Sequence, residues 1–252
     1  MTVPANYVLP LPENVPLDIG ALVEPLSVGW HAVSQSPLKK DSNILILGGG
    51  PIGISVILAL RTQGCGEIIV SELSSSRQKF AKHFGATHII DPSKESNFVK
   101  KIQDLTNGEG VDIVFDCAGV AVGLEAACQS IKARGTVVNV AIWEKAVPFQ
   151  PNNLVWREGK YVACLGYVQQ DFKDVIKAVS SGELRVLPFC YLFEGGDLGI
   201  SWGNPMLIDF VAGAMRPGDM ITRKIALENV VEDGIKTLIT DKESHVKILV
   251  QI

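Results

Sequence analysis

The chain has 252 residues, of which 47% are hydrophobic and 20% are charged, and its net charge at pH 7 is −4. This composition is ordinary for a globular protein, and the length suits one large domain or one and a half. The acidic balance argues against a nucleic acid or an anionic membrane as a partner, because both favour a basic surface.

The cysteines and the first residues indicate the compartment. Five cysteines lie far apart, with no CxxC motif and no histidine at metal spacing, which is typical of free thiols in a reducing compartment. The N-terminus lacks the basic and apolar regions of a signal peptide, and the longest apolar run, "ISVILAL", is too short to span a bilayer. We therefore expect a cytoplasmic protein and no zinc cluster made from this chain alone. The cysteines are Cys65, Cys117, Cys128, Cys164 and Cys190.

The chain begins with a proline-rich stretch, after which predicted strands alternate with predicted helices. Residues 1–30 are proline-rich and lead into the helix-like "IGALVEPLSVGWHAV", which spans residues 19–33. Short apolar runs then alternate with segments of helical spacing, such as residues 74–86 and 123–133. Continuous apolar strands imply burial on both faces, which predicts an α/β fold with a doubly wound parallel sheet of the Rossmann type. The expected strands are residues 43–47, 67–71, 87–91, 111–116, 135–141 and 161–166.

The first predicted strand leads into a glycine loop. Gly48, Gly50 and Gly53 form G-x-G-x-x-G, followed by a helix with Pro51 and Ile52 in its first turn. Such glycines permit a tight turn, a close approach of backbone to a pyrophosphate, and close packing of helix on strand. The helix N-terminus attracts phosphate. A plain βα turn is the alternative, but strand, helix and a later acidic residue all favour a dinucleotide site.

That acidic residue is Glu72, which ends the second predicted strand about 20 residues beyond the loop, where a ribose-binding carboxylate belongs. A carboxylate repels a 2′-phosphate, so Glu72 favours NAD over NADP. Arg77 complicates this prediction, because it could stack on adenine or pair with a phosphate. A solvated helix charge is the alternative for Arg77.

Two further strand ends reach the same edge of the sheet. Asp116 leads into "CAGV", where Cys117, Ala118 and Gly119 are candidates for contact with the cofactor near its nicotinamide ribose. The stretch "VNVAIW", with Val140 and Ile142, could offer backbone groups to the carboxamide. Cys117 as a nucleophile is the alternative; no nearby histidine would activate it, so packing is favoured.

The histidines and the C-terminal segment carry weaker signals. His31, in the helix before the sheet, could relay a proton or bind a metal, but a structural role is favoured. His83, His88 and His245 are expected at the surface or at strand edges. Residues 217–252 predict a strand, a helix and a terminal strand.

With these features, the chain resembles the zinc-dependent medium-chain dehydrogenase/reductases, in the branch of butanediol and sorbitol dehydrogenases. The resemblance implies NAD-dependent oxidation of a secondary alcohol or diol, such as 2,3-butanediol, to a ketone, with a catalytic zinc. It also implies a small-molecule alcohol or ketone as substrate and a possible homo-oligomer. The matching stretches are residues 11–33, 44–53, 70–92, 110–119, 135–149 and 220–250.

One departure from the family is large. Members begin with a catalytic domain of about 100–200 residues that carries most zinc ligands, and only Glu24, in "ALVEPLS", matches a position at the zinc. We therefore expect residues 1–30 to be a remnant of this GroES-like domain, residues 31–185 the NAD-binding domain, and 217–252 a return to the GroES-like domain. Met1 is expected to be an interior methionine, so that the chain is truncated and weakly active or inactive.

Residues 186–216 are unlike the family, and joining Arg185 to Pro217 restores its pattern. We expect a retained intron here, with a true insertion as the alternative, and exposed aromatic residues in either case. Two other functions stay open: a zinc-free quinone or enoyl reductase using NADPH, and a non-catalytic nucleotide-binding module. The aromatic residues expected to be exposed are Phe189, Tyr191, Phe193 and Trp202.

Overall fold

A computed structural model of the chain describes residues 2–184, 217–241 and 243–251. The atypical segment 186–216, with Cys190 and the four aromatic residues named above, lies outside the described residues. Within the described ranges, no helix is long and apolar enough to cross a membrane.

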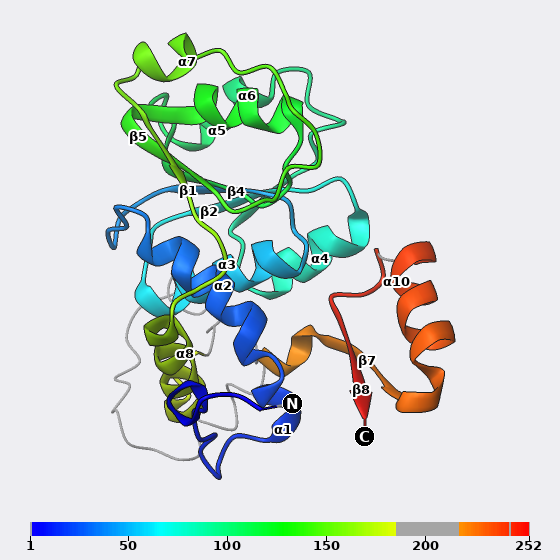
Figure 1. Cartoon of the computed structure of the whole chain (residues 1–252). Helices are drawn as coiled ribbons and strands as arrows, with labels where there is room; N and C mark the ends of the chain where they lie inside the picture. The colour runs from blue at the N-terminus through cyan, green and yellow to red at the C-terminus, as the bar shows by residue number, and fades with distance from the viewer. Residues whose placement is uncertain (1, 185–216, 242, 252) are drawn as a thin grey trace, which may run out of the picture.

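A six-stranded parallel sheet forms the centre of the molecule (Figure 1). The strand order is β3-β2-β1-β4-β5-β6, so the winding reverses between β1 and β4. The sequence therefore predicted the Rossmann-type doubly wound sheet correctly, and its switch point lies where β1 and β4 end. The strands are β1 (Ile44–Leu47), β2 (Ile68–Ser71), β3 (His88–Ile90), β4 (Val111–Asp116), β5 (Ile131–Asn139) and β6 (Lys160–Ala163).

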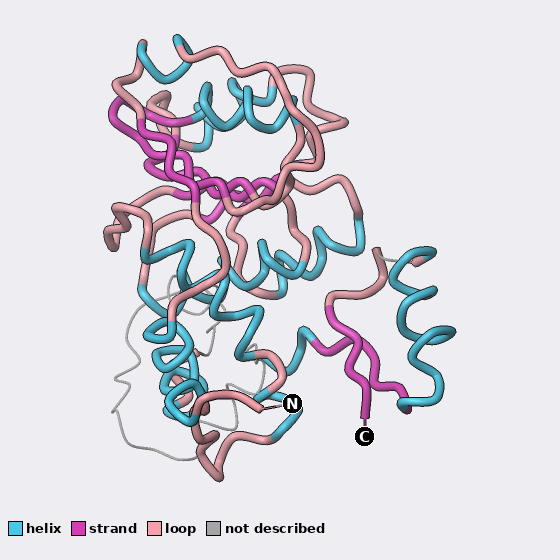
Figure 2. Tube along the Cα trace, viewed as in Figure 1, coloured by secondary structure: helices cyan, strands magenta, loops and turns pink. Residues whose placement is uncertain are grey.

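Helices cover both faces of this sheet, as Figure 2 shows. Side chains of β1 point alternately to the two sides: Ile44 and Ile46 pack in one apolar cluster, and Leu45 and Leu47 in the other. All four are buried, which explains why the strand is apolar throughout rather than alternating. One face carries α2 (Val23–Ser34), α3 (Pro51–Gln63), α4 (Ser75–His83) and α8 (Gln169–Ser181); the other carries α5 (Phe98–Leu105), α6 (Ala121–Ser130) and α7 (Asn152–Val155).

The predicted helical segment 123–133 extends too far. Helix α6 ends at Ser130, and Ile131 already pairs with Val111 in the parallel ladder. The guanidinium of Arg157 donates to the carbonyl of Ile131 at 3.0 Å and to that of Gln129 at 2.9 Å. Because these carbonyls at the helix end are satisfied by a distant arginine, the helical spacing of the sequence could not show where the helix stops.

The two ends of the chain add smaller elements. Strands β7 (Ile221–Ala226) and β8 (Lys247–Gln251) form a separate parallel pair, and in Figure 1 this pair and α10 (Thr237–Thr240) lie apart from the main sheet, on the side that carries α2 and α4. The predicted order of strand, helix and strand is confirmed. A two-stranded sheet is marginal without further packing. The other short elements are η1 (Ala5–Tyr7), α1 (Leu17–Gly20), η3 (Pro217–Met220), η4 (Leu227–Asn229) and the π-helix η5 (Val230–Lys236).

Candidate functional site

The glycine loop joins β1 to α3 at the carboxyl edge of the sheet. Gly48 has a φ of +95°, a left-handed conformation that favours glycine. A Cβ at Gly53 would lie 2.0 Å from the carbonyl oxygen of Gly48, so this position in α3 has no room for a side chain. The first and third glycines therefore let the helix start directly against the strand, as the sequence predicted.

The N-terminus of α3 faces outward from this turn. Gly50 caps the helix and Pro51 occupies its first turn, where the missing N–H costs nothing. A Cβ at Gly50 would have no atom closer than 3.9 Å, so the space beside the backbone is open. Ile52, in the same turn, is half-buried. Together, the open space and the helix dipole make a position where an anion can approach the backbone.

Glu72 follows β2 and bonds to this loop. Its Oε2 accepts the N–H of Gly49 at 2.8 Å, and its Oε1 accepts the N–H of Ser74 at 2.9 Å. The side chain is buried, with 8% of the residue exposed. A carboxylate has about four lone-pair positions, so Glu72 retains acceptor capacity for ribose hydroxyls while it is held by the two N–H groups.

Arg77 lies on α4 beside the same loop. Its Nη1 is the atom closest to the open position at Gly50, at 3.9 Å from an added Cβ, and the residue is half-buried. The loop is thus flanked by one carboxylate and one guanidinium. This geometry suits the phosphate-pairing alternative for Arg77 better than that of a solvated helix charge.

Asp116, at the end of β4, organises the neighbouring loop. Its Oδ1 accepts the N–H groups of Ala118 and Gly119, both at 3.0 Å. Its main-chain carbonyl accepts the N–H of Val140 at 2.9 Å and that of Ala141 at 3.0 Å. Burial raises the pKa of the Asp116 carboxyl, while the N–H groups of Gly119 and Ala118 lower it. The loops after β4 and β5 are therefore fixed to one residue.

This arrangement limits what the residues of the two loops can offer. Because the Val140 N–H is already donated to Asp116, Val140 has only its carbonyl and side chain left for a cofactor. Ile142 is 80% exposed. Burial raises the pKa of the Cys117 thiol well above its ordinary value, and the nearby Asp116 and Cys164 add to this shift. A thiol held in its neutral form is a poor nucleophile, which supports packing as the role of Cys117.

Glu24 lies on α2 and is exposed. A catalytic zinc takes three protein ligands and a water. Among the residues that the structure describes, no three His, Cys, Asp or Glu side chains are grouped so that they could hold a metal ion. The described residues therefore do not fit a zinc site by themselves. The sequence did not indicate that a phenol, that of Tyr167, lies near this carboxylate. Burial raises the pKa of Tyr167, and the charge of Glu24 adds to this shift.

All four histidines have partners that sequence spacing could not show, and two of them lie within 3.0 Å of a carboxylate. His31 Nδ1 lies 2.8 Å from Asp171 Oδ2, and this pair joins α2 to α8 with only 14% and 9% of the two side chains exposed. His83 Nε2 lies 3.0 Å from Asp219 Oδ2 at the surface. The buried pair agrees with a structural role for His31.

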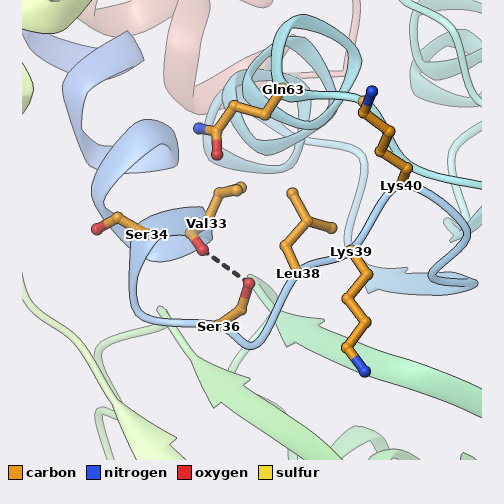
Figure 3. A pocket seen from close by; sticks show the side chains of 8 residues that line it. Val33, Ser34, Ser36, Leu38, Lys39, Lys40 and Gln63 are labelled. Atoms are coloured by element: carbon orange, nitrogen blue, oxygen red, sulfur yellow. Dashed lines mark hydrogen bonds between the residues drawn. The ribbon is translucent and has the colours of Figure 1, made fainter.

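A separate cleft lies at the opposite end of the sheet from the glycine loop. It has a volume of about 340 Å³ and is lined by residues between the ends of α2 and α3, including Val33, Leu38, Lys39, Lys40 and Gln63. In Figure 3 the side chains of Val33 and Leu38 point into it, while the two lysines extend apart. Helix α3 runs from the carboxyl to the amino edge of the sheet, so this cleft is not part of the dinucleotide site.

The fold and the loops define a class of protein. A doubly wound sheet with G-x-G-x-x-G at the switch point and a carboxylate after β2 is a dinucleotide-binding arrangement. Residues 51–181 match the family described as zinc-binding dehydrogenase. The chain belongs to this family of zinc-type medium-chain dehydrogenases, in the butanediol and sorbitol dehydrogenase branch.

Several relatives support the assignment of the chain to this branch. It is 35% identical to (R,R)-butanediol dehydrogenase of Saccharomyces cerevisiae over 252 residues, which are 99% of this chain and 58% of the relative. The (R,R)-butanediol dehydrogenase of Bacillus subtilis is 35% identical over 251 residues, 100% of this chain and 62% of the relative. Sorbitol dehydrogenase 1 of Saccharomyces cerevisiae is 30% identical over 190 residues, 73% of this chain and 53% of the relative.

A solved structure agrees with this placement. The crystal structure of 2R,3R-butanediol dehydrogenase from Bacillus subtilis superposes with a TM-score of 0.78 at 35% identity, covering 96% of this chain and 60% of that one. The chain therefore spans less than two thirds of the length of each of these relatives.

Proposed function

We propose that the chain binds NAD and supplies the cofactor-binding part of an oxidoreductase that interconverts a small secondary alcohol or diol, such as 2,3-butanediol, with its ketone. The names of the relatives support the substrate class. The observation that carries the cofactor is the bond from Gly49 N–H to the Glu72 carboxylate, because it joins the phosphate loop to a ribose acceptor.

Each part of the site has one function in this proposal. The open backbone at Gly50 and the N-terminus of α3 hold the pyrophosphate. Glu72 accepts the adenosine ribose hydroxyls and repels a 2′-phosphate, which favours NAD over NADP. The residues after β4 and β5 hold the nicotinamide side, since these strands lie on the other side of the switch point. NAD, when bound, accepts a hydride from the alcohol carbon.

Zinc is typical of the family, but the described residues offer it only the exposed carboxylate of Glu24. We therefore propose that the 252-residue chain binds NAD and oxidises alcohol weakly or not at all on its own. A small-molecule substrate, a possible homo-oligomer and a cytoplasmic location belong to the same proposal. The name of the relative supports the small-molecule substrate. The homo-oligomer is what the family resemblance implies, and the cytoplasmic location rests on the scattered cysteines.

Two assays on the pure chain test this function. Titration with NADH, followed by nicotinamide fluorescence, is expected to show binding. Oxidation of 2,3-butanediol with NAD, with and without added zinc, is expected to show little or no NADH formation. Zinc-dependent turnover would contradict the second half of the proposal. A preference for NADPH would instead favour the quinone or enoyl reductase type.

A further inference from the structure

Asp116 occupies a special place in the sheet. It is the last residue of β4, the strand between β1 and β5, and pairs in register with Leu47 and Asn139. It is 0% exposed. The reversal of winding lies directly beside it, where ligands of doubly wound sheets bind.

One residue here fixes two loops. The Oδ1 atom holds the N–H groups of Ala118 and Gly119, in the manner of an aspartate that stabilises a turn in its own chain. The carbonyl of Asp116 holds the N–H groups of Val140 and Ala141. The next residue, Cys117, donates its N–H to the carbonyl of Leu47 at 3.0 Å, which ties the same loop to β1.

The loop at residues 117–119 is closely packed against its neighbours. Gly119 has a φ of +63°, and a Cβ there would lie 2.9 Å from the Cβ of Ala141. Ala118 contacts the glycine loop from the other side, since its Cβ would be 3.4 Å from a Cβ at Gly48. The loop at residues 117–119 therefore lies between the phosphate loop and the end of β5, with little room for a different conformation on the β5 side.

The free-energy cost of burying the Asp116 carboxylate indicates that it has a function. Asp116 Oδ2 is buried and has no hydrogen-bond partner in the part of the chain that the structure describes. A buried carboxylate with one unpaired oxygen is destabilising, and an apolar side chain at the end of this strand would avoid that cost. The two N–H groups that Oδ1 holds are what an apolar side chain could not replace.

We propose that Asp116 is a positioning residue of the dinucleotide site: its carboxylate holds the loop at residues 117–119 in the conformation that receives the nicotinamide ribose. This inference rests on the proposed binding of NAD. It predicts that Asp116 matters for the nicotinamide half of the cofactor and not for the adenosine half, which lies at β1 and β2.

The test measures the binding of NAD and of AMP to the full 252-residue chain by calorimetry. Asp116→Ala removes the acceptor and is expected to bind NAD about tenfold more weakly, from the loss of bonds to a charged group, with AMP binding unchanged. Asp116→Asn keeps an oxygen at the Oδ1 position and is expected to restore most of the NAD affinity.

Asp112 provides a matched control on the same strand. Its Oδ2 accepts the N–H of Asn43 at 2.8 Å at the amino end of β4, away from the loops. Asp112→Ala is expected to leave the ratio of NAD to AMP affinity at the wild-type value. If Asp116→Ala does not fold, Asp116→Val, which also lacks the acceptor and suits the buried end of a strand, replaces it with the same expected loss.

Three results would overturn the inference: NAD affinity unchanged in the alanine variant, NAD and AMP affinities falling together, or an asparagine variant no better than alanine. A wild-type chain that binds neither ligand would overturn the proposed function itself, which is a different result from wild-type binding with indifferent variants.

Discussion

Replacing Gly53 with alanine tests how closely the glycine loop and α3 approach each other. The new Cβ would lie 2.0 Å from the Gly48 carbonyl oxygen and 3.1 Å from its carbonyl carbon, whereas ordinary contact begins at 3.4 Å. Both opposing atoms are backbone, so no change of rotamer relieves the overlap. The helix or the loop has to move.

The magnitude follows from two opposing effects. Alanine is better than glycine inside a helix by about 1 kcal/mol, whereas overpacking a tight site costs about 1–3 kcal/mol and occasionally more. Because backbone meets the new methyl group, we expect the upper end of that cost and a net loss of about 2 kcal/mol in the free energy of unfolding. Urea unfolding followed by circular dichroism should show a lower midpoint with an unchanged slope.

Gly50→Ala is the comparison variant. Its Cβ would have Arg77 Nη1 as nearest atom at 3.9 Å, so the stability should stay within about 0.5 kcal/mol of wild type. Its affinity for NAD should nevertheless fall, because the methyl group enters the space proposed for the pyrophosphate. Wild-type stability in Gly53→Ala would refute the close approach, and undiminished NAD binding in Gly50→Ala would refute the phosphate position.

Three further predictions concern the cofactor, a thiol and a buried pair. Glu72→Ala should lower the affinity of the chain for NAD about tenfold. It should also reduce the ratio of NAD affinity to NADP affinity, measured by calorimetry. An unchanged ratio would show that Glu72 does not select NAD over NADP. Burial raises the pKa of the Cys65 thiol to about 11 from 9.0. The folded state thus prefers the neutral thiol, and the associated stability, complete below pH 9, should be lost as the pH rises towards 11; a Cys65→Ala variant with the same alkaline loss would contradict this. A double-mutant cycle on His31→Ala and Asp171→Ala should give a coupling of about 1–3 kcal/mol in unfolding free energy, and additive effects would show that the 2.8 Å pair contributes nothing.

The sequence predicted much of the sheet and of the loop, because their signals are local. Buried parallel strands are continuously apolar, and each of the six predicted runs overlaps an observed strand, although β5 and β6 begin earlier than predicted. Gly48, Gly53 and Pro51 have the positions that their backbone requirements demand. Glu72 contacts the glycine loop because β1 and β2 are neighbouring parallel strands of one βαβ unit, so that their carboxyl ends lie side by side.

What the sequence did not predict depends on contacts between distant residues. The partner of His31 is 140 residues away, and no spacing rule connects α2 to α8. Arg157, 28 residues beyond Gln129, donates to the carbonyls at the end of α6. The sequence placed Asp116 at the end of β4, but it could not show that the carboxylate holds the N–H groups of Ala118 and Gly119, because these bonds depend on the conformation of the loop.

The most direct test of the account is a calorimetric titration of the pure 252-residue chain with NAD and, separately, with NADP. We expect a single NAD site per chain and much weaker binding of NADP, because the Glu72 carboxylate lies beside the glycine loop. Absence of NAD binding, or NADP binding as tight as NAD, would contradict it.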